Sequence, residues 1–331
     1  MPTFGLEEEV FVTEPERPSL ASLIYLARLL ARDPRFYYTH TASNFARGRD
    51  IRCGLMSGIE FSTGVHTTVE GLLEDFSSQR RRLARVADGL IVAAGHLLQF
   101  QTPTSVCGLQ LHLGRLPDKD RAYRNIAYFL PLVSLITANS PAANLHRMGR
   151  SVRIQNSFAI GPLRPDRHYR YQDLIYSRRL GTIEVRIADP CPNMERIRIF
   201  VQVLEALAVS ETERQIDYDR YKRLRTEAAK KGYRGGLREL YTELQDEIEI
   251  DEAHFQTSPA DQFWDAYENF GLVGAYSALD NQYRGGKLQP ARYPHKSLAR
   301  RTSLAAAGFT GYFLPKLPYY VWKAAVENRR P

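Results

Sequence analysis

The sequence predicts an α+β fold, in which an antiparallel sheet of about six strands is covered by helices on one face. Two observations support this prediction. Several short segments alternate apolar and polar residues with a period of two, which is typical of strands with one buried and one exposed face. Longer segments between them repeat apolar residues at helical spacing, so these helices would cover the apolar face of the sheet.

The first strand is expected at residues 4–12, FGLEEEVFV. Alternation places Glu7 and Glu9 on one face of this strand and turns Glu8 to the other. Three later segments alternate in the same way: GIEFST, GLQLHLG and GTIEVRIAD. The exposed face of the sheet would therefore carry Glu7, Glu9, Glu60, His112, Glu184 and Arg186.

The helical segments are equally distinct. A possible capping box from Thr67 to Glu70 opens a long helix, and Pro131 is expected to kink another one. The charged section that follows residue 213 suggests two exposed helices, separated near residues 232–236. The four clearest helices are expected at residues 19–33, 67–99, 118–139 and 193–213.

Composition suggests a soluble, cytoplasmic protein. The chain has 331 residues, of which 44% are hydrophobic and 25% charged, as in ordinary globular proteins. No apolar run is long enough to cross a membrane, and no signal peptide is recognisable. The three cysteines (Cys53, Cys107 and Cys191) lack the spacing of a disulfide framework or a zinc ribbon.

Charge is unevenly distributed along the chain. The net charge is +8, and the segment from Arg284 onward holds ten Lys or Arg residues but one acid, Glu327. We expect this segment to form an irregular wrap that is solvated or folded over an anionic ligand, and nucleic acid is an unlikely partner. Residues 1–213 would form the core of a single domain, and residues 214–331 a helical extension and basic C-terminal segment of the same domain.

The chemistry of the exposed face depends on its charges. Carboxylates crowded together raise one another's pKa, so a cation is expected among them. Oxygen ligands suit Mg²⁺, and an added histidine leans toward Mn²⁺. Simpler interpretations remain open: a single glutamate on such a strand is usually solvated, and a single histidine is usually structural. No phosphate-binding loop of the GxxxxGK[ST] or GxGxxG type occurs.

Five motifs in order carry a family resemblance: GLEEEVFV, GIEFSTGVHTT, GLQLHLG, LPLVSLITANSP followed by SVRIQNS, and GTIEVRIADP. Together they resemble the glutamate-cysteine ligase type 2 family, also called the carboxylate-amine ligases, of the glutamine synthetase-like superfamily. The likeness covers roughly residues 4–200. It implies a curved sheet with helices on the convex face. It also implies an ATP-dependent ligase that joins a carboxylate, such as that of glutamate, to an amine through an acyl phosphate.

The resemblance also implies roles for individual residues. Arg186, Glu184 and Arg153 would be catalytic, and Arg186, Arg153 and His112 would contact the nucleotide. One metal ion would bridge the nucleotide phosphates and a second would lie near the substrate carboxylate. The ligands of the first would be Glu7, His112 and Glu184, and those of the second Glu9 and Glu60.

One position departs from the family pattern, because Cys53 stands where an acidic residue is usual. The second metal could then keep an extra water, the site could prefer Mn²⁺, or the protein could be a catalytically silent relative that binds nucleotide or an amino acid. A homodimer is plausible by resemblance. The basic tail could serve as a lid, and Glu8→Gln should be tolerated better than changes at Glu7 or Glu9.

Overall fold

A mainly antiparallel sheet forms the centre of the protein. The computed structural model describes residues 1–35, 42–45, 56–101, 106–156, 160–291, 298–318 and 322, so the prediction for Cys53 lies outside the described residues. Seven strands make up the main sheet, in the order β2-β3-β1-β5-β9-β8, with β4 paired to β1. These strands are β1 (Thr3–Thr13), β2 (Ala42–Phe45), β3 (Met56–Ser62), β4 (Leu90–Val92), β5 (Leu109–Gly114), β8 (Leu174–Ser177) and β9 (Thr182–Val185). A separate pair joins β6 (Ala142–Ala143) to β7 (His146–Arg147).

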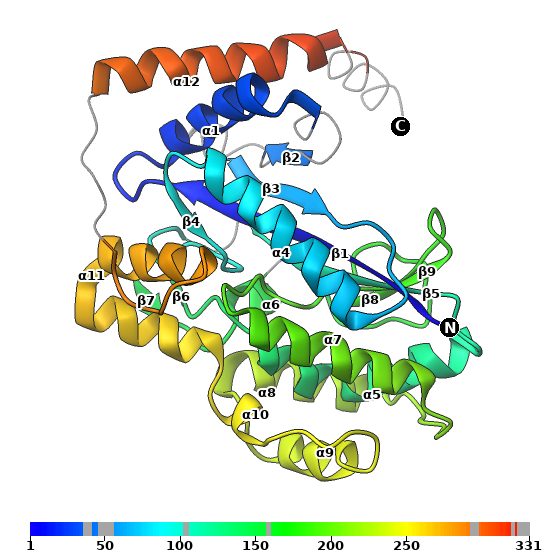
Figure 1. Ribbon diagram of the computed structural model, residues 1–331. Helices are drawn as coiled ribbons and strands as arrows, with labels where there is room; N and C mark the ends of the chain where they lie inside the picture. The colour runs from blue at the N-terminus through cyan, green and yellow to red at the C-terminus, as the bar shows by residue number, and fades with distance from the viewer. Residues whose placement is uncertain are drawn as a thin grey trace.

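Helices cover one face of this sheet, as the sequence predicts. Figure 1 shows α4 and α7 lying across the front of the strands, with α5 and α8 beyond α7. The α-helices are α1 (Pro18–Arg32), α4 (Val69–Val86), α5 (Lys119–Thr137), α6 (Val152–Asn156), α7 (Met194–Val209), α8 (Tyr218–Lys231), α9 (Gly236–Leu244), α10 (Ala253–Gln256), α11 (Pro259–Tyr283) and α12 (Leu298–Phe313).

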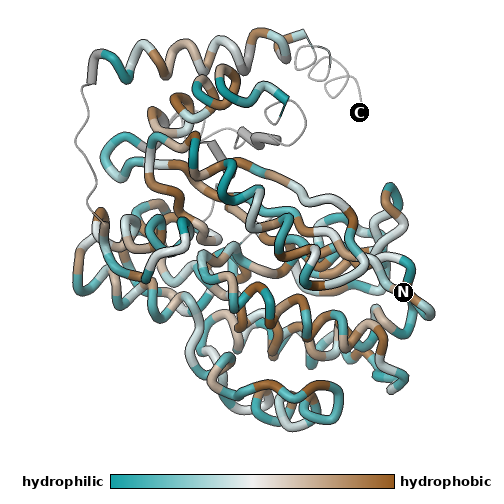
Figure 2. Tube along the Cα trace, in the orientation of Figure 1, coloured by the Kyte–Doolittle hydropathy of each residue, from teal (hydrophilic) through white to brown (hydrophobic). Residues whose placement is uncertain are grey.

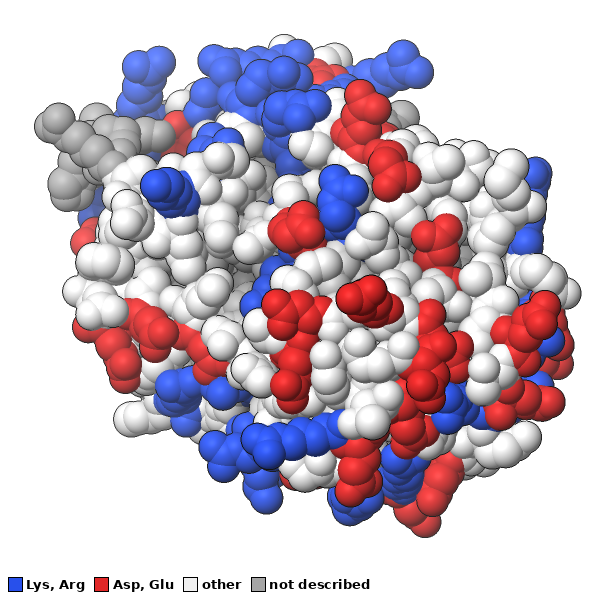
Figure 3. All heavy atoms as spheres, turned by 60° about the horizontal axis from the view of Figure 1, so that its bottom comes forward, with Lys and Arg blue, Asp and Glu red and all other residues white. Residues whose placement is uncertain are grey.

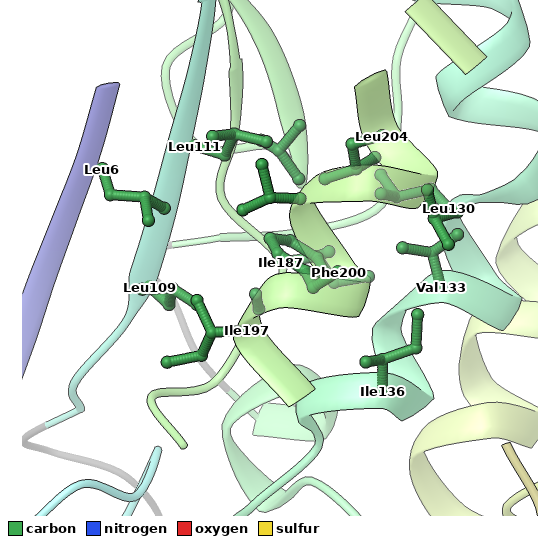
Figure 4. Close-up of a cluster of buried hydrophobic side chains, with 14 of the residues drawn as sticks. Leu6, Leu109, Leu111, Leu130, Val133, Ile136, Ile187, Ile197, Phe200 and Leu204 are labelled. Carbon is green, nitrogen blue, oxygen red and sulfur yellow. The ribbon is translucent and has the colours of Figure 1, made fainter. Parts of the chain in front are cut away.

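The hydrophobic core lies between the sheet and these helices. Leu6 of β1 and Leu109 of β5 lie on the sheet side of one buried cluster, and α7 with Phe200 lies between the sheet and Leu130 and Val133 of α5 (Figure 4). Figure 2 shows hydrophobic residues concentrated in α7 and hydrophilic residues on the outer turns of α4. Burial of this apolar surface fixes which face of each strand points toward the helices.

The core continues beyond residue 213. Tyr221 and Leu224 of α8, together with Leu237 and Leu240 of α9, belong to the same buried cluster as the sheet residues. The two helices predicted on either side of residues 232–236 are therefore confirmed as α8 and α9. Each is exposed on one face and packs an apolar face on the core. α11 closes the other end of the sheet, where Asp280 Oδ1 accepts a hydrogen bond of 2.9 Å from the backbone N–H of Ile91 in β4.

One helix is shorter than the sequence suggests. The helix expected at residues 67–99 ends at Val86, and the apolar run after it forms β4, which pairs with β1. Gly89 lets the chain before β4 pass close to β1 and α1, because a Cβ atom there would lie 2.6 Å from Ala21 Cβ and 2.8 Å from the carbonyl oxygen of Thr13. An apolar run of this length fits a helix or a strand equally well, so periodicity alone gave the wrong element.

The tail is also more regular than predicted, because α12 lies along α1 at the top of Figure 1. Gly308 lets the two helices meet closely, since a side chain there would collide with the backbone of Leu23. Part of the basic charge is neutralised: Arg301 pairs with Glu14 at 2.6 Å and with Asp88 at 3.2 Å.

The surface carries charge of both signs. On the face drawn in Figure 3, basic side chains gather most densely along the upper edge and mix with acidic ones over the lower half. Within the described residues, no helix combines the length and the hydropathy that a membrane span requires.

Candidate active site

A pocket of about 520 Å³ opens on the face of the sheet that the helices leave uncovered. The six residues that the sequence places on this face all line it: Glu7, Glu9, Glu60, His112, Glu184 and Arg186. The alternation in β1 is confirmed as well. Glu7 and Glu9 are half-buried in the pocket wall, whereas Glu8 between them is fully buried on the opposite face.

Strand register sets the neighbours within the pocket. Glu9 of β1 lies directly opposite Glu60 of β3. On the other side of β1, His112 of β5 lies opposite Glu184 of β9. Directly opposed side chains on one face of a sheet are close neighbours. The pairs that the resemblance assigns to the two metal sites are therefore neighbours in the sheet.

His112 links two of these strands. Its Nδ1 lies 3.2 Å from Thr182 Oγ1, and its Nε2 lies 3.6 Å from Glu7 Oε1. The Nε2 atom is buried and has no hydrogen-bond partner in the described part of the chain. Interaction with the His112 side chain lowers the pKa of Glu7, and the nearby Arg186 charge contributes in the same direction.

The pKa values of Glu9 and Glu60 are raised, whereas that of Glu7 is lowered. Burial raises the pKa of Glu60 to about 8, and the charges of Glu9 and Glu7 add to this shift. Burial also raises the pKa of Glu9, although its Oε2 accepts a 2.9 Å hydrogen bond from the backbone N–H of Gly108. This corner of the pocket has too little positive charge for its carboxylates.

Arg186 crosses the floor of the pocket. Its Nη1 donates to Gln110 Oε1 at 3.2 Å and also to Glu184 Oε1. The guanidinium group thus touches a predicted metal ligand while it lines the pocket, which suits a role in balancing the negative charge of a ligand.

Arg153 lies elsewhere. It is buried and does not line the pocket, but it lies directly behind it, where its charge opposes the effect of burial on the pKa of Glu9. Its guanidinium donates to the carbonyl oxygens of Arg186 at 3.0 Å and of Ile187 at 3.0 Å, and it lies 3.7 Å from Asp189 Oδ1. In this position Arg153 holds the chain segment that follows β9.

The rim of the pocket contains residues that the sequence analysis missed. Arg178 and Arg179 come from the turn between β8 and β9, and Arg170 comes from the loop before β8. All three are exposed. The sequence SRRLG at residues 177–181 could have indicated Arg178 and Arg179, because it leads directly into the strand TIEV. Its last residue, Gly181, lies in the left-handed region at φ +69°, as a tight turn requires. Together the three arginines place a basic rim over an acidic floor.

The side chains in the pocket fit a divalent cation. Carboxylate oxygens and an imidazole nitrogen are the donors that Mg²⁺ and Mn²⁺ accept. Among the described residues His112 Nε2 has no hydrogen-bond partner, and its Nδ1 is engaged by Thr182, as is usual for metal-binding histidines. Within the described residues, no three His, Cys, Asp or Glu side chains already stand in a metal-holding geometry. Glu184 instead accepts a hydrogen bond from Arg186.

The C-terminal segment does not reach this pocket within the described residues. No described residue after Arg186 lines it, and α12 packs on α1 instead. The described part of the tail therefore lies away from the pocket, and a lid formed by the tail stays a prediction.

Glu8 forms a separate charged cluster on the helix-covered face. Arg80 of α4 donates two hydrogen bonds to its carboxylate, the longer of them 3.1 Å, and Tyr283 Oη donates a third at 3.1 Å. Arg80 also donates to the carbonyl oxygen of Cys191 at 2.7 Å. Burial raises the pKa of Glu8, and the positive charge of Arg80 opposes that shift. Glu8 therefore has a structural role, and Glu8→Gln is expected to destabilise the fold, contrary to the expectation from the sequence that this change is tolerated.

Comparison with known proteins gives a match in structure only. No family model matches the sequence, and no curated protein matches it. Glutamate-cysteine ligase from Francisella tularensis, solved in complex with AMP, matches with a TM-score of 0.57 and 12% identity over 95% of this chain and 94% of that chain. A bifunctional glutathione synthetase from Pasteurella multocida matches with a TM-score of 0.55 and 14% identity over 86% of this chain.

The second match covers 51% of the Pasteurella chain, so this chain spans about half the length of that protein. The first match extends over nearly the whole of both chains. Identity this low establishes a shared fold, whereas activity has to be argued from the site. The sequence resemblance is thus confirmed at the level of structure: this chain has the fold of glutamate-cysteine ligase.

Proposed function

We propose that the acidic pocket is the active site of an ATP-dependent carboxylate-amine ligase. The observation that carries this proposal is the composition of the pocket, in which carboxylates and an imidazole from four strands form the floor and three arginines form the rim. The shared fold agrees with it, and the AMP bound to the Francisella enzyme supports an adenine nucleotide as a ligand. The family motifs and their spacing add independent support.

Two divalent cations would be held by the floor of the pocket. Glu7, His112 and Glu184 would hold one, and Glu9 and Glu60 the other. Magnesium or manganese bound there would neutralise phosphate oxygens and orient the phosphoryl group. The high pKa of Glu60 supports a cation at its position, because a positive charge would relieve the repulsion among the carboxylates.

The proposed reaction has two steps. In the first, an oxygen of the substrate carboxylate attacks the γ-phosphorus of ATP, and the bond to the ADP oxygen breaks. In the second, the amine nitrogen attacks the acyl carbon, the C–O bond to phosphate breaks, and the nitrogen loses a proton. The products are an amide, ADP and phosphate.

The residues of the chain would act mainly through charge and position. Arg186 would balance the negative charge that develops on the phosphoryl group, and its contact with Gln110 would fix the guanidinium plane. Arg153 is a positioning residue in this scheme, because it holds the backbone of Arg186 from behind. The rim arginines would attract anionic substrates into the pocket.

A substrate screen tests the proposal. Purified protein with ATP and Mg²⁺ would be incubated with pairs of acids and amines, starting with amino-acid carboxylates such as glutamate, and the products analysed by mass spectrometry. We expect a condensation product and stoichiometric ADP for one pair, both lost in Glu184→Gln. Saturable ATP binding without a product across a broad panel would contradict the proposal and identify a nucleotide-binding relative without ligase activity.

A further inference from the structure

A second pocket lies on the helix-covered side of β1. It has a volume of about 440 Å³, which is within the usual range for small-molecule sites, and it shares no lining residue with the acidic pocket. Its walls come from α4, the start of α7 and the end of α11. The residues that matter for its chemistry are Arg80, Arg81, Arg85, Met194, Tyr283 and Arg284.

The inner wall of this α4 pocket is fixed by the Glu8 cluster. Arg80 and Tyr283 both donate hydrogen bonds to Glu8, and the Arg80 Cζ atom lies 4.5 Å from the centre of the Tyr283 ring. These contacts use the hydrogen-bonding groups of Arg80 fully, since its Nη1 also donates to the carbonyl oxygen of Pro192 at 3.1 Å. A ligand would meet a rigid wall there and would find its charge partners elsewhere.

The outer wall carries positive charge without matching carboxylates. Arg81 and Arg85 are exposed, and neither pairs with an acidic side chain in the described part of the chain. Arg81 donates to Ser77 Oγ at 2.8 Å. Arg284, by contrast, is neutralised by Asp280 at 2.9 Å. Arginines four residues apart on one helix repel each other, and an anion between them would remove that repulsion.

The pocket also offers apolar surface. Met194 and Tyr283 line it beside the arginines, and both are suited to pack against a flat or irregular apolar group. Guanidinium groups bind phosphate through paired hydrogen bonds. We propose that the α4 pocket binds a small phosphate monoester, with its phosphate between Arg81 and Arg85 and its apolar part against Met194 and Tyr283.

This inference does not depend on ligase activity. The α4 pocket lies on the opposite side of β1 from Glu7 and Glu9. Tyr283 in its inner wall donates a hydrogen bond to Glu8 of the same strand. A ligand there would be distinct from any nucleotide bound in the acidic pocket. Binding can therefore be measured in the absence of turnover, and failure of either proposal leaves the other intact.

The test is calorimetric titration of phenyl phosphate into the full chain at constant ionic strength. The rim arginines of the acidic pocket would also attract this probe, so the titration uses the Arg178→Ala/Arg179→Ala background. We expect saturable binding that weakens by about tenfold or more when Arg81→Ala/Arg85→Ala is added, since charge-assisted hydrogen bonds are lost. Removal of two exposed charges from α8, by Arg223→Ala/Lys230→Ala, should leave the affinity unchanged.

Two outcomes would overturn the inference. One is an absence of saturable binding, and the other is an affinity that is unaffected by the loss of Arg81 and Arg85. A comparison with inorganic phosphate tests the apolar contacts: phenyl phosphate should bind more tightly, and equal affinities would exclude a role for Met194 and Tyr283. Because Arg81 and Arg85 are exposed, the variant should fold, and its unfolding curve without ligand checks this.

Discussion

The two faces of β1 carry neighbouring glutamates in opposite situations. Glu8 is sealed behind α4 and is bound by Arg80 and Tyr283, so its charge is compensated within the protein. Glu7 and Glu9 face an open pocket on whose floor four glutamates lie around Arg186 while the other lining arginines stand at the exposed rim, and burial together with this crowding raises the pKa of Glu60 to about 8. One face therefore uses charge to hold the fold, whereas the other has unbalanced charge that a ligand can satisfy.

The largest expected effect is on the buried face. Glu8→Gln should lower the free energy of unfolding by about 3–5 kcal/mol, because Arg80 would remain buried without a carboxylate. Urea unfolding of the variant measures this loss. Replacing both partners, as in Glu8→Leu/Arg80→Met, should restore much of the stability. If Glu8→Gln were as stable as the wild type, the ion pair between Glu8 and Arg80 would not be what holds β1 and α4 together.

The next effect is on the open face. Glu7→Gln should lower the rate of ADP formation by about 100-fold, as expected for the loss of a group that positions transition-state charge. Its free energy of unfolding should change little, because the side chain is half-buried in an open pocket. Steady-state kinetics with the condensing pair of substrates, alongside urea unfolding, separates the two effects. Normal turnover in this variant would remove Glu7 from the site.

Glu60, on the open face of the sheet, should make the free energy of unfolding depend on pH. Its pKa rises from 4.5 to about 8 on folding, so its contribution to stability is complete below pH 4.5 and is lost as the pH rises through 8. Without divalent ions, Glu60→Gln should therefore gain stability relative to the wild type between pH 5 and pH 8, by about 2 kcal/mol. Urea unfolding at both pH values, with exposed Glu211→Gln as the control, tests this; a pH-independent difference would contradict it.

The smallest effect concerns the rim. Arg178→Ala/Arg179→Ala should raise the KM for an anionic substrate by about tenfold and leave kcat nearly unchanged, because exposed charges mainly promote association. The increase should shrink at high salt. A fall in kcat with an unchanged KM would instead place these arginines at the reacting atoms.

Much of the open face could be predicted from the sequence, because alternation along a strand is a local property. It correctly grouped Glu7, Glu9, Glu60, His112, Glu184 and Arg186. The buried face could not be predicted in the same way. The partner of Glu8 is 72 residues away in the chain, and no local pattern identifies it. The same limit applies to Arg153, because the packing of α6 decides that its side chain reaches the backbone of Arg186 from behind the pocket and does not line it.

The tail shows the other limit. Gly, Pro and Tyr suggested an irregular wrap, but the segment includes α12, which packs on α1. Gly308 within this helix allows α12 and α1 to approach closely. A glycine at a helix crossing has the same local signal as a glycine in a loop, and tertiary contact decides between them.

Binding of Mn²⁺ tests the central claim most directly, because it needs no knowledge of the substrates. Electron paramagnetic resonance would follow free Mn²⁺ during titration of the protein with a non-hydrolysable ATP analogue present. We expect binding by the wild type that falls about tenfold or more in Glu184→Gln and in Glu7→Gln, whereas Glu211→Gln binds as the wild type does. Equal Mn²⁺ binding by all four proteins would contradict the assignment of the open face of β1 as a metal and nucleotide site.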